Sequence, residues 1–234
     1  MNIYRHILQL DLRQLVRDRS LWVFVMMPFL MTPLMRWGWP WLVEWVPELS
    51  GWGAHAMILM ASVLALTPAI LWGLPMLEEK SGQLWSVWNS SPVPLWKWLG
   101  IRLGSATFLS MIFAGTFLAL GGEMRITRLD WALLTGLMGL LAPTFTLMVL
   151  ALASNQVEGL TVFKGLNVLI VIPLVLSALD ISPGWSMLLP TEGLYQFADG
   201  LAWTSGLFLR STLIMLGWLL GSYVWLWWRN GKTW

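Results

Sequence analysis

The chain has 234 residues, of which 57% are hydrophobic and 11% are charged, with a formal net charge of +2 and a mean hydropathy of +0.68. Soluble domains are about 45–50% apolar, so an ordinary soluble domain is excluded, and six membrane spans of about 20 residues leave no room for a separate soluble catalytic domain. Cysteine is absent, which excludes disulfides, thiolate metal sites and a cysteine nucleophile.

Residues 1–20 predict a helix that lies on the membrane surface. Apolar and basic side chains between Asn2 and Arg17 fall on roughly opposite helical faces, which is typical of an interfacial amphipathic helix. The apolar stripe contains Tyr4, Leu8, Leu12 and Leu15, and the other face contains Arg5, Gln9, Arg13 and Arg17. We interpret the segment as an elbow helix on the cytoplasmic leaflet. The alternative is a simple positive flank of the first span.

The rest of the chain predicts an all-α, polytopic membrane domain over residues 1–234. Apolar stretches place about six transmembrane helices at residues 21–37, 54–77, 99–120, 131–153, 166–179 and 206–228. Most of the 14 Lys and Arg fall on one side of the membrane if the N-terminus is inside. By the positive-inside rule, both termini are expected to be cytoplasmic.

The stretch at 166–179 is short for a full crossing, and residues 180–205 after it are rich in Pro and Gly yet remain fairly apolar. Irregular backbone at membrane depth must be covered by protein or line a cavity. Residues 180–205 therefore predict a re-entrant segment on the outer side. An ordinary loop with one short helix fits equally well.

The segment 78–98, between the second and third expected spans, is the most informative. Residues 81–89 can form a short helix. The Ser91-Pro92 pair ends it, because a residue before proline disfavours the helical conformation. Leu84, Trp85 and Trp88 would share one face of it. Such a face suits docking into a groove of a partner, and anchoring in the membrane interface by Trp residues is the competing reading.

Two loops carry a resemblance to a known family. The segment 78–98 resembles the cytoplasmic loop of ABC-2-type permeases, and the matching residues are Glu78, Glu79, Gly82, Leu84, Ser91, Pro92 and Val93. Residues 154–164 resemble the loop between spans 4 and 5 of permeases described as fluoroquinolone exporters, and the matching residues are Asn155, Val157, Glu158, Gly159 and Lys164. The chain departs from the family at Gln83 and Trp85, where a Thr-Leu-Glu run is usual.

The resemblance implies the permease subunit of an ATP-driven ABC exporter in the bacterial inner membrane. It also implies two permease subunits per transporter and a separate ATP-binding subunit that brings ATP and Mg and docks on the coupling helix in segment 78–98. A haem-exporter-type permease of cytochrome c maturation and a non-transporting scaffold subunit are alternatives. No nucleic-acid partner is expected.

The sequence offers little for catalysis by the chain itself. Gly231-Lys232-Thr233 resembles the end of a phosphate-binding loop, but Leu226 stands where the earlier glycine is required. The only histidines, His6 and His55, cannot form a zinc-protease motif, which argues against an intramembrane hydrolase. We expect no enzyme activity, no metal and no cofactor in this chain.

The expected spans hold no Asp or Glu, although ion-driven pumps usually need intramembrane carboxylates or histidines. A self-sufficient proton-coupled carrier is therefore disfavoured. Polar residues within the spans are candidates for the substrate path, namely Thr67, Thr144, Thr146 and Asn167. The apolar interior suits an amphipathic, drug-like or lipid-like cargo better than an ion or sugar.

Overall fold

The computed structural model describes residues 9, 13, 17, 21–85, 95–122, 124, 126–179, 181, 183–200 and 205–230. Every regular element in these ranges is a helix. In chain order they are α2 (Trp22–Pro33), η2 (Leu34–Gly38), α3 (Trp39–Trp45), η3 (Pro47–Trp52), α4 (Gly53–Ser81), α6 (Leu95–Leu120), α7 (Arg128–Gly139), α8 (Leu141–Leu152), α9 (Gln156–Ala178), η4 (Gly184–Leu188), α10 (Glu192–Ala198) and α11 (Ser205–Asn230).

Among the described residues, five helical stretches are long and apolar enough to cross a membrane. They are Pro47–Ser81, Leu95–Leu120, Arg128–Leu152, Gln156–Ala178 and Gly206–Arg229. The all-α, multi-pass architecture is thus confirmed. The expected elbow at 1–20 lies almost wholly outside the described residues and stays a prediction.

The first expected span, residues 21–37, is helical but is not among these five stretches. α2 contains Pro28 and Pro33, and a π-helical turn, η2, follows before α3 resumes the α-helical pattern. Proline removes a backbone donor and interrupts the α-helical hydrogen bonds, and a π turn is one way in which a helix accommodates such a break. That residues 21–37 cross the membrane stays a prediction.

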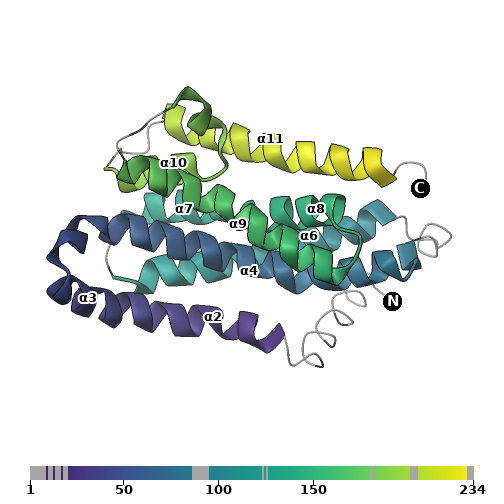
Figure 1. Ribbon diagram of the computed structural model, residues 1–234, viewed down its shortest axis with the longest axis horizontal. Coiled ribbons are helices and arrows are strands. Elements are labelled where there is room, and N and C mark those ends of the chain that lie inside the picture. The colour runs from purple at the N-terminus through teal and green to yellow at the C-terminus, as the bar shows by residue number, and fades with distance from the viewer. Residues whose placement is uncertain are drawn as a thin grey trace.

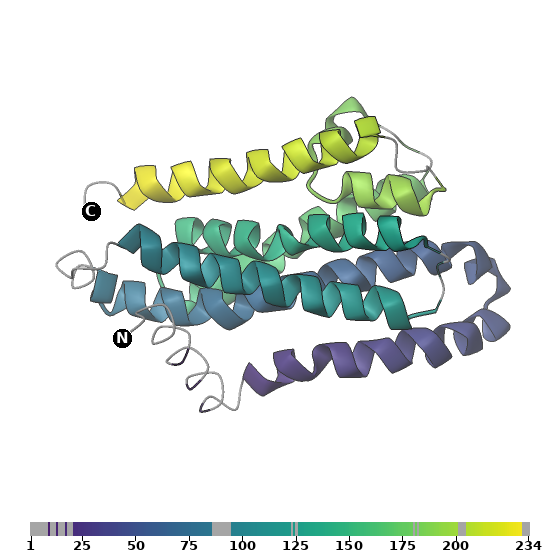
Figure 2. The same cartoon turned by 180° about the vertical axis from the view of Figure 1, so that it is seen from behind.

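The helices form an elongated bundle in which α2 and α11 lie on opposite sides (Figures 1 and 2). α4 and the α7–α8 pair form its centre, since 78% of the most apolar 18-residue window of each is buried, whereas only 22% and 17% of the corresponding windows of α9 and α11 are buried. α4 packs on α6, α8 and α9, and α11 packs on α8. We call the two ends of the bundle the Gly53 end and the Ser81 end, after the first and last residues of α4.

A buried hydroxyl links three of the central helices. The Ser110 side chain of α6 is fully buried, and its Oγ lies 2.7 Å from the Ala65 carbonyl oxygen of α4 and 3.0 Å from the Met138 carbonyl oxygen of α7. Small residues allow this close approach of membrane helices, and their hydroxyls find backbone acceptors across the interface. The core therefore has polar as well as apolar contacts.

α9 begins ten residues before the expected fifth span, so the segment 154–164 is not a loop beyond Asn155. Asn155 caps the helix by accepting a hydrogen bond from the Glu158 backbone N–H at 3.0 Å, and the Glu158 carboxylate accepts from the Ser154 N–H at 2.8 Å. This reciprocal arrangement satisfies donors that a helix start otherwise leaves unpaired. The fifth span is therefore of full length, and the prediction that it is short was wrong.

The segment after α9 folds back onto the bundle at the Gly53 end. Its described part contains η4 and the short helix α10, which packs on α4, α9 and α11 (Figure 1). Gly193 of α10 lies so close to Ser211 of α11 that an added Cβ would overlap its hydroxyl. The short helix fits either reading of residues 180–205, and a re-entrant course stays a prediction.

Candidate functional site

The last turn of α4, at the Ser81 end, makes polar contacts in several directions. Glu79 forms a bidentate ion pair with Arg102 of α6, with both N–O distances at 2.9 Å. The two side chains are only 16% and 6% exposed, and the guanidinium also lies 3.9 Å from the centre of the Trp98 ring. This pair fixes the end of α4 to the start of α6 through a charged, largely desolvated contact.

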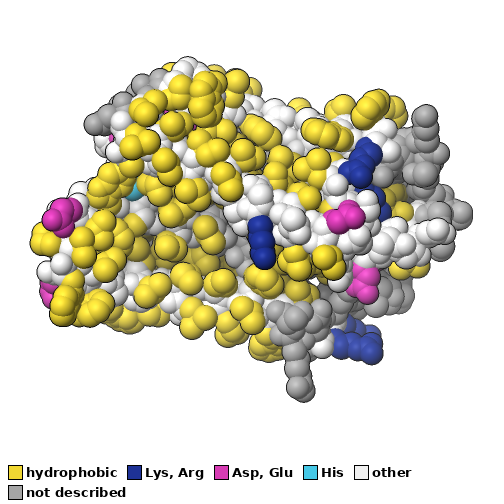
Figure 3. Space-filling view, in the orientation of Figure 1, with side chains coloured by type: hydrophobic (Ala, Val, Ile, Leu, Met, Phe, Trp, Pro, Cys, Tyr) yellow, Lys and Arg dark blue, Asp and Glu magenta, His cyan; other side chains and the backbone are white. Residues whose placement is uncertain are grey.

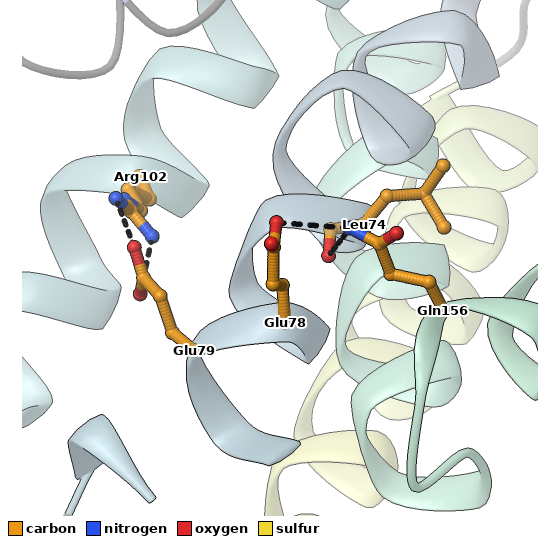
Figure 4. A network of polar contacts seen from close by, with 5 residues as sticks. All are labelled: Leu74, Glu78, Glu79, Arg102 and Gln156. Atoms are coloured by element: carbon orange, nitrogen blue, oxygen red, sulfur yellow. Dashed lines mark hydrogen bonds and ion pairs between the residues drawn. The ribbon is translucent and has the colours of Figure 1, made fainter. Parts of the chain in front are cut away.

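Glu78, one residue earlier, connects α4 to α9. Its Oε2 accepts a hydrogen bond of 3.1 Å from the Gln156 side-chain amide, which also lies 3.4 Å from the Leu74 carbonyl oxygen. Figure 4 shows Glu79 turned toward Arg102 and Glu78 turned toward Gln156, on different sides of the same helix. The two adjacent carboxylates thus contact different helices, Glu79 contacting α6 and Glu78 contacting α9.

Lys80 connects α4 to the end of α8. Its Nζ donates to the carbonyl oxygens of Leu150 and Ala153 at 2.6 and 3.2 Å, and Arg229 of α11 donates to the Ala151 carbonyl. The last carbonyls of a helix lack partners within the helix and carry partial negative charge, so cations stabilise them. Two basic residues therefore cap α8 and tie it to α4 and α11.

The second predicted segment lies beside this turn. Its Asn155 and Glu158 cap α9, as described above. Gly159 faces α4 so closely that an added Cβ would lie 2.3 Å from Leu77 Cδ1, and Leu77 is fully buried. Lys164 is exposed on the surface of α9. Asn155, Glu158 and Gly159 thus serve the junction between α9 and its neighbours, whereas Val157 and Lys164 are exposed.

The expected coupling helix is only partly described. α4 ends at Ser81, Gly82 caps it by donating its N–H to the Glu78 carbonyl at 2.9 Å, and Gln83 has a left-handed φ of +59°. Leu84 is 47% exposed, whereas Trp85 is 8% exposed and packs within the chain. The expectation that both present one exposed face is therefore wrong for Trp85. Trp88, Ser91 and Pro92 lie outside the described residues.

On the face of the molecule drawn in Figure 3, most charged side chains lie toward the two ends of the bundle. In Figure 3 hydrophobic side chains cover most of the middle of the visible face, and most Lys and Arg gather toward the right, which is the Ser81 end. An apolar band between charged ends is typical of a protein that spans a bilayer.

The three threonines proposed for the substrate path are buried and satisfied within their own helices. Thr67, Thr144 and Thr146 donate to the carbonyls four residues earlier, at 3.3, 2.7 and 2.8 Å. This pattern is a common way to satisfy a hydroxyl in a membrane helix. Asn167 is partly exposed on α9. None of these residues lines the groove described below, and their role in transport stays a prediction.

Sequence reasoning missed Arg102 and Gln156 as members of this site. Arg102 lies within an expected span, where a buried ionisable residue implies a partner, so its position was a usable signal. Nothing local to Gln156 indicates that it reaches Glu78, because the two are 78 residues apart.

A family model described as "Fluoroquinolones export permease protein Rv2686c-like" matches residues 11–228, nearly the whole chain. The chain belongs to this family. It is therefore a multi-pass membrane protein of an export permease family, and the resemblance inferred from the two loops is confirmed. No curated protein and no solved structure gives a significant match.

Proposed function

We propose that the chain is the membrane-spanning subunit of an ABC-type exporter that moves amphipathic, drug-like compounds across the bacterial inner membrane, powered by a separate ATPase subunit. The family match over residues 11–228 carries this proposal, because its description names a fluoroquinolone export permease. In this proposal both termini and the Ser81 end face the cytoplasm, and two permease subunits form one transporter.

The Ser81 end has features that suit a docking surface for the ATPase. Leu84 is an exposed apolar side chain directly after the polar junction of α4, α6, α8 and α9. A partner bound at Leu84 would act on a turn that is tied to each of these helices. Such a connection is what the transmission of ATP-driven motion requires.

The surface also has room for an apolar cargo. A groove of about 460 Å³ runs between α8 and α11, and its walls are almost entirely apolar. Met148 and Leu152 line one side, and Ile214 and Trp225 line the other. The volume lies within the range of small-molecule sites, which are mostly apolar, so the groove supports an amphipathic cargo over an ion or a sugar.

The proposal is tested by purifying the tagged chain in mild detergent and identifying what accompanies it. We expect an ABC ATPase subunit in the complex, no ATP hydrolysis by the chain alone, and ATP-dependent fluoroquinolone transport by the reconstituted complex. Transport without any ATPase subunit, or ATP turnover by the chain freed of contaminants, would contradict it.

Leu84→Asp should weaken the complex with the ATPase, because it places a charge in an apolar contact. The matched control is Leu129→Asp, an equally drastic change at an exposed leucine of α7 at the Gly53 end. Equal complex yields for the two variants would show that the ATPase does not dock at Leu84.

A further inference from the structure

The groove between α8 and α11 is long as well as apolar. Its lining residues on α11 extend from Ile214 to Trp225, which is about 16 Å of helix at 1.5 Å per residue. Gly217 and Gly221 belong to this wall, and a Cβ added to either would meet nothing within 4 Å. No side chain of the described residues therefore fills the space beside these two glycines.

The groove opens on a lipid-facing surface of the chain. Only 17% of the most apolar 18-residue window of α11 is buried, and Leu213, Leu216 and Leu220 of this helix are exposed. At membrane depth an exposed apolar helix face is in contact with the acyl chains of the lipids. Acyl chains therefore have direct access to the groove.

Arg229 lies at the Ser81 end of the groove. Trp218, Ser222 and Trp225 line the groove from α11. Arg229 follows Trp225 by four residues, which places it on the same face of the helix, one turn nearer the Ser81 end. Its guanidinium donates to the carbonyl oxygen of Ala151, a residue of the opposite wall. The groove thus ends at a positive charge that bridges its two walls.

The Arg229 guanidinium retains donors for a ligand. The bond to Ala151 uses one nitrogen of a group that has five N–H donors, and Arg229 is exposed. Among the described residues it has no carboxylate within ion-pair distance. Phosphate oxygens are suited to such a group, because they accept parallel hydrogen bonds from a guanidinium.

The charge around Arg229 also favours an anion. Lys80 and Arg229 lie close enough for their charges to repel each other, and Glu158 offsets part of this positive charge. The Glu158 carboxylate is engaged by the Ser154 backbone N–H at 2.8 Å and by the Asn155 side-chain amide at 3.1 Å. An anion at Arg229 would relieve the repulsion between the two cations.

We propose that this groove binds an anionic phospholipid of the leaflet at the Ser81 end, with one acyl chain between α8 and α11 and the phosphate on the guanidinium of Arg229. Basic sites between membrane helices recognise acidic lipid headgroups in this way. A lipid is favoured over other anionic amphiphiles, because the groove opens among lipid-facing side chains and its charged end lies at the end of the bundle. The site does not depend on the export function, and a cargo that enters the groove would compete with the lipid.

The binding test uses the purified chain in detergent, without any ATPase, and native mass spectrometry to count bound lipids. The probes are dioleoyl phosphatidylglycerol, which is anionic, and dioleoyl phosphatidylcholine, which has the same acyl chains but is net neutral. We expect the first phosphatidylglycerol to bind at least about tenfold more tightly than phosphatidylcholine, because Arg229 recognises its net charge. Equal affinities of the two lipids would overturn the proposal.

Arg229→Gln should remove this preference, and Arg229→Lys should keep most of it because the charge remains. The matched control is Lys97→Gln, which removes an exposed basic residue at the start of α6, outside the groove. The preference is a ratio of two affinities of one protein, so it would not change if Arg229 only stabilised the end of α8. An unchanged preference in Arg229→Gln, or an equal loss in Lys97→Gln, would refute the assignment.

Gly221→Leu should weaken the binding of both lipids several-fold, because the new side chain occupies the groove. The matched control is Gly104→Leu in α6, an exposed position outside the groove where an added Cβ also meets nothing within 4 Å. Equal lipid binding by these two variants would overturn the proposal. Loss of a dimer in Gly221→Leu, with lipid binding unchanged, would assign the groove to a second copy of the chain instead. A chain that binds phosphatidylglycerol but never assembles with an ATPase would contradict the export function and leave the lipid site standing.

Discussion

The ion pair between Glu79 and Arg102 makes a quantitative prediction. Because the two side chains are 16% and 6% exposed, removing one leaves the other charged and largely out of water. Breaking a buried pair in this way costs about 3–5 kcal/mol, and the residual exposure of Glu79 favours the lower limit. Glu79→Gln should therefore lower the stability by about 3 kcal/mol, which for a chain of this size is a drop of roughly 6–12 °C in the thermal midpoint.

The double variant Glu79→Gln with Arg102→Met should recover much of this loss, because no unpaired charge remains. Thermal unfolding in detergent, followed by intrinsic fluorescence, measures the wild type, both single variants and the double variant. Glu44→Gln is the control, since this carboxylate is exposed in α3 and should change the stability by less than about 0.5 kcal/mol. Strictly additive losses in the cycle would refute the reasoning.

The same variant decides between two roles for Glu79. If the carboxylate served the ATPase subunit, as the sequence resemblance implies, Glu79→Gln would reduce complex yield and leave the stability of the isolated chain unchanged. The structure engages this carboxylate inside the chain, so we expect the stability to fall first.

Three further predictions concern the neighbours of this pair. Gly159→Ala should destabilise the protein by about 1–3 kcal/mol, because the added methyl group overpacks against Leu77. Gly165→Ala in the same helix, where an added Cβ meets nothing within 4 Å, should be neutral or stabilising by up to about 1 kcal/mol. A lower thermal midpoint for Gly165→Ala than for Gly159→Ala would contradict this prediction. Lys80→Met should cost about 1.5–3 kcal/mol, because two bonds from a charged donor to carbonyls near the end of α8 are lost, and an unchanged midpoint would show that water replaces them. Asn155→Ala should cost about 1 kcal/mol through the lost cap, and hydrogen exchange should quicken in the first turn of α9, not at its end.

Hydropathy was sufficient to locate most of the bundle, because the need for a long apolar stretch does not depend on how helices pack. The stretches expected at residues 54–77, 99–120 and 206–228 fall within α4, α6 and α11, and the stretch at 131–153 is covered by α7 and α8 up to Leu152. Hydropathy was insufficient to locate the start of α9. The polar run at 154–164 looks like a loop by hydropathy, although Asn155 and Glu158 form a capping pair that marks a helix start.

The polar contacts at the Ser81 end and at the Gly53 end could not be predicted from the sequence. Glu79 and Arg102 are 23 residues apart, and His55 and Asp199 are 144 residues apart, so their pairing depends on how the helices associate. Only the burial of an ionisable residue in an apolar helix hints that a partner exists. The burial of Trp85 was unpredictable for the same reason, since an amphipathic face can turn inward or outward.

Three consecutive side chains at the end of α4 set which motions this helix can make. Successive residues of an α-helix point about 100° apart, and Glu78, Glu79 and Lys80 accordingly reach α9, α6 and the end of α8. Rotation of α4 about its own axis would strain all three contacts together, whereas tilting of the four helices as one body would keep them. A force applied just beyond Ser81 is therefore expected to tilt α4, α6, α8 and α9 together, with little bending of any single helix.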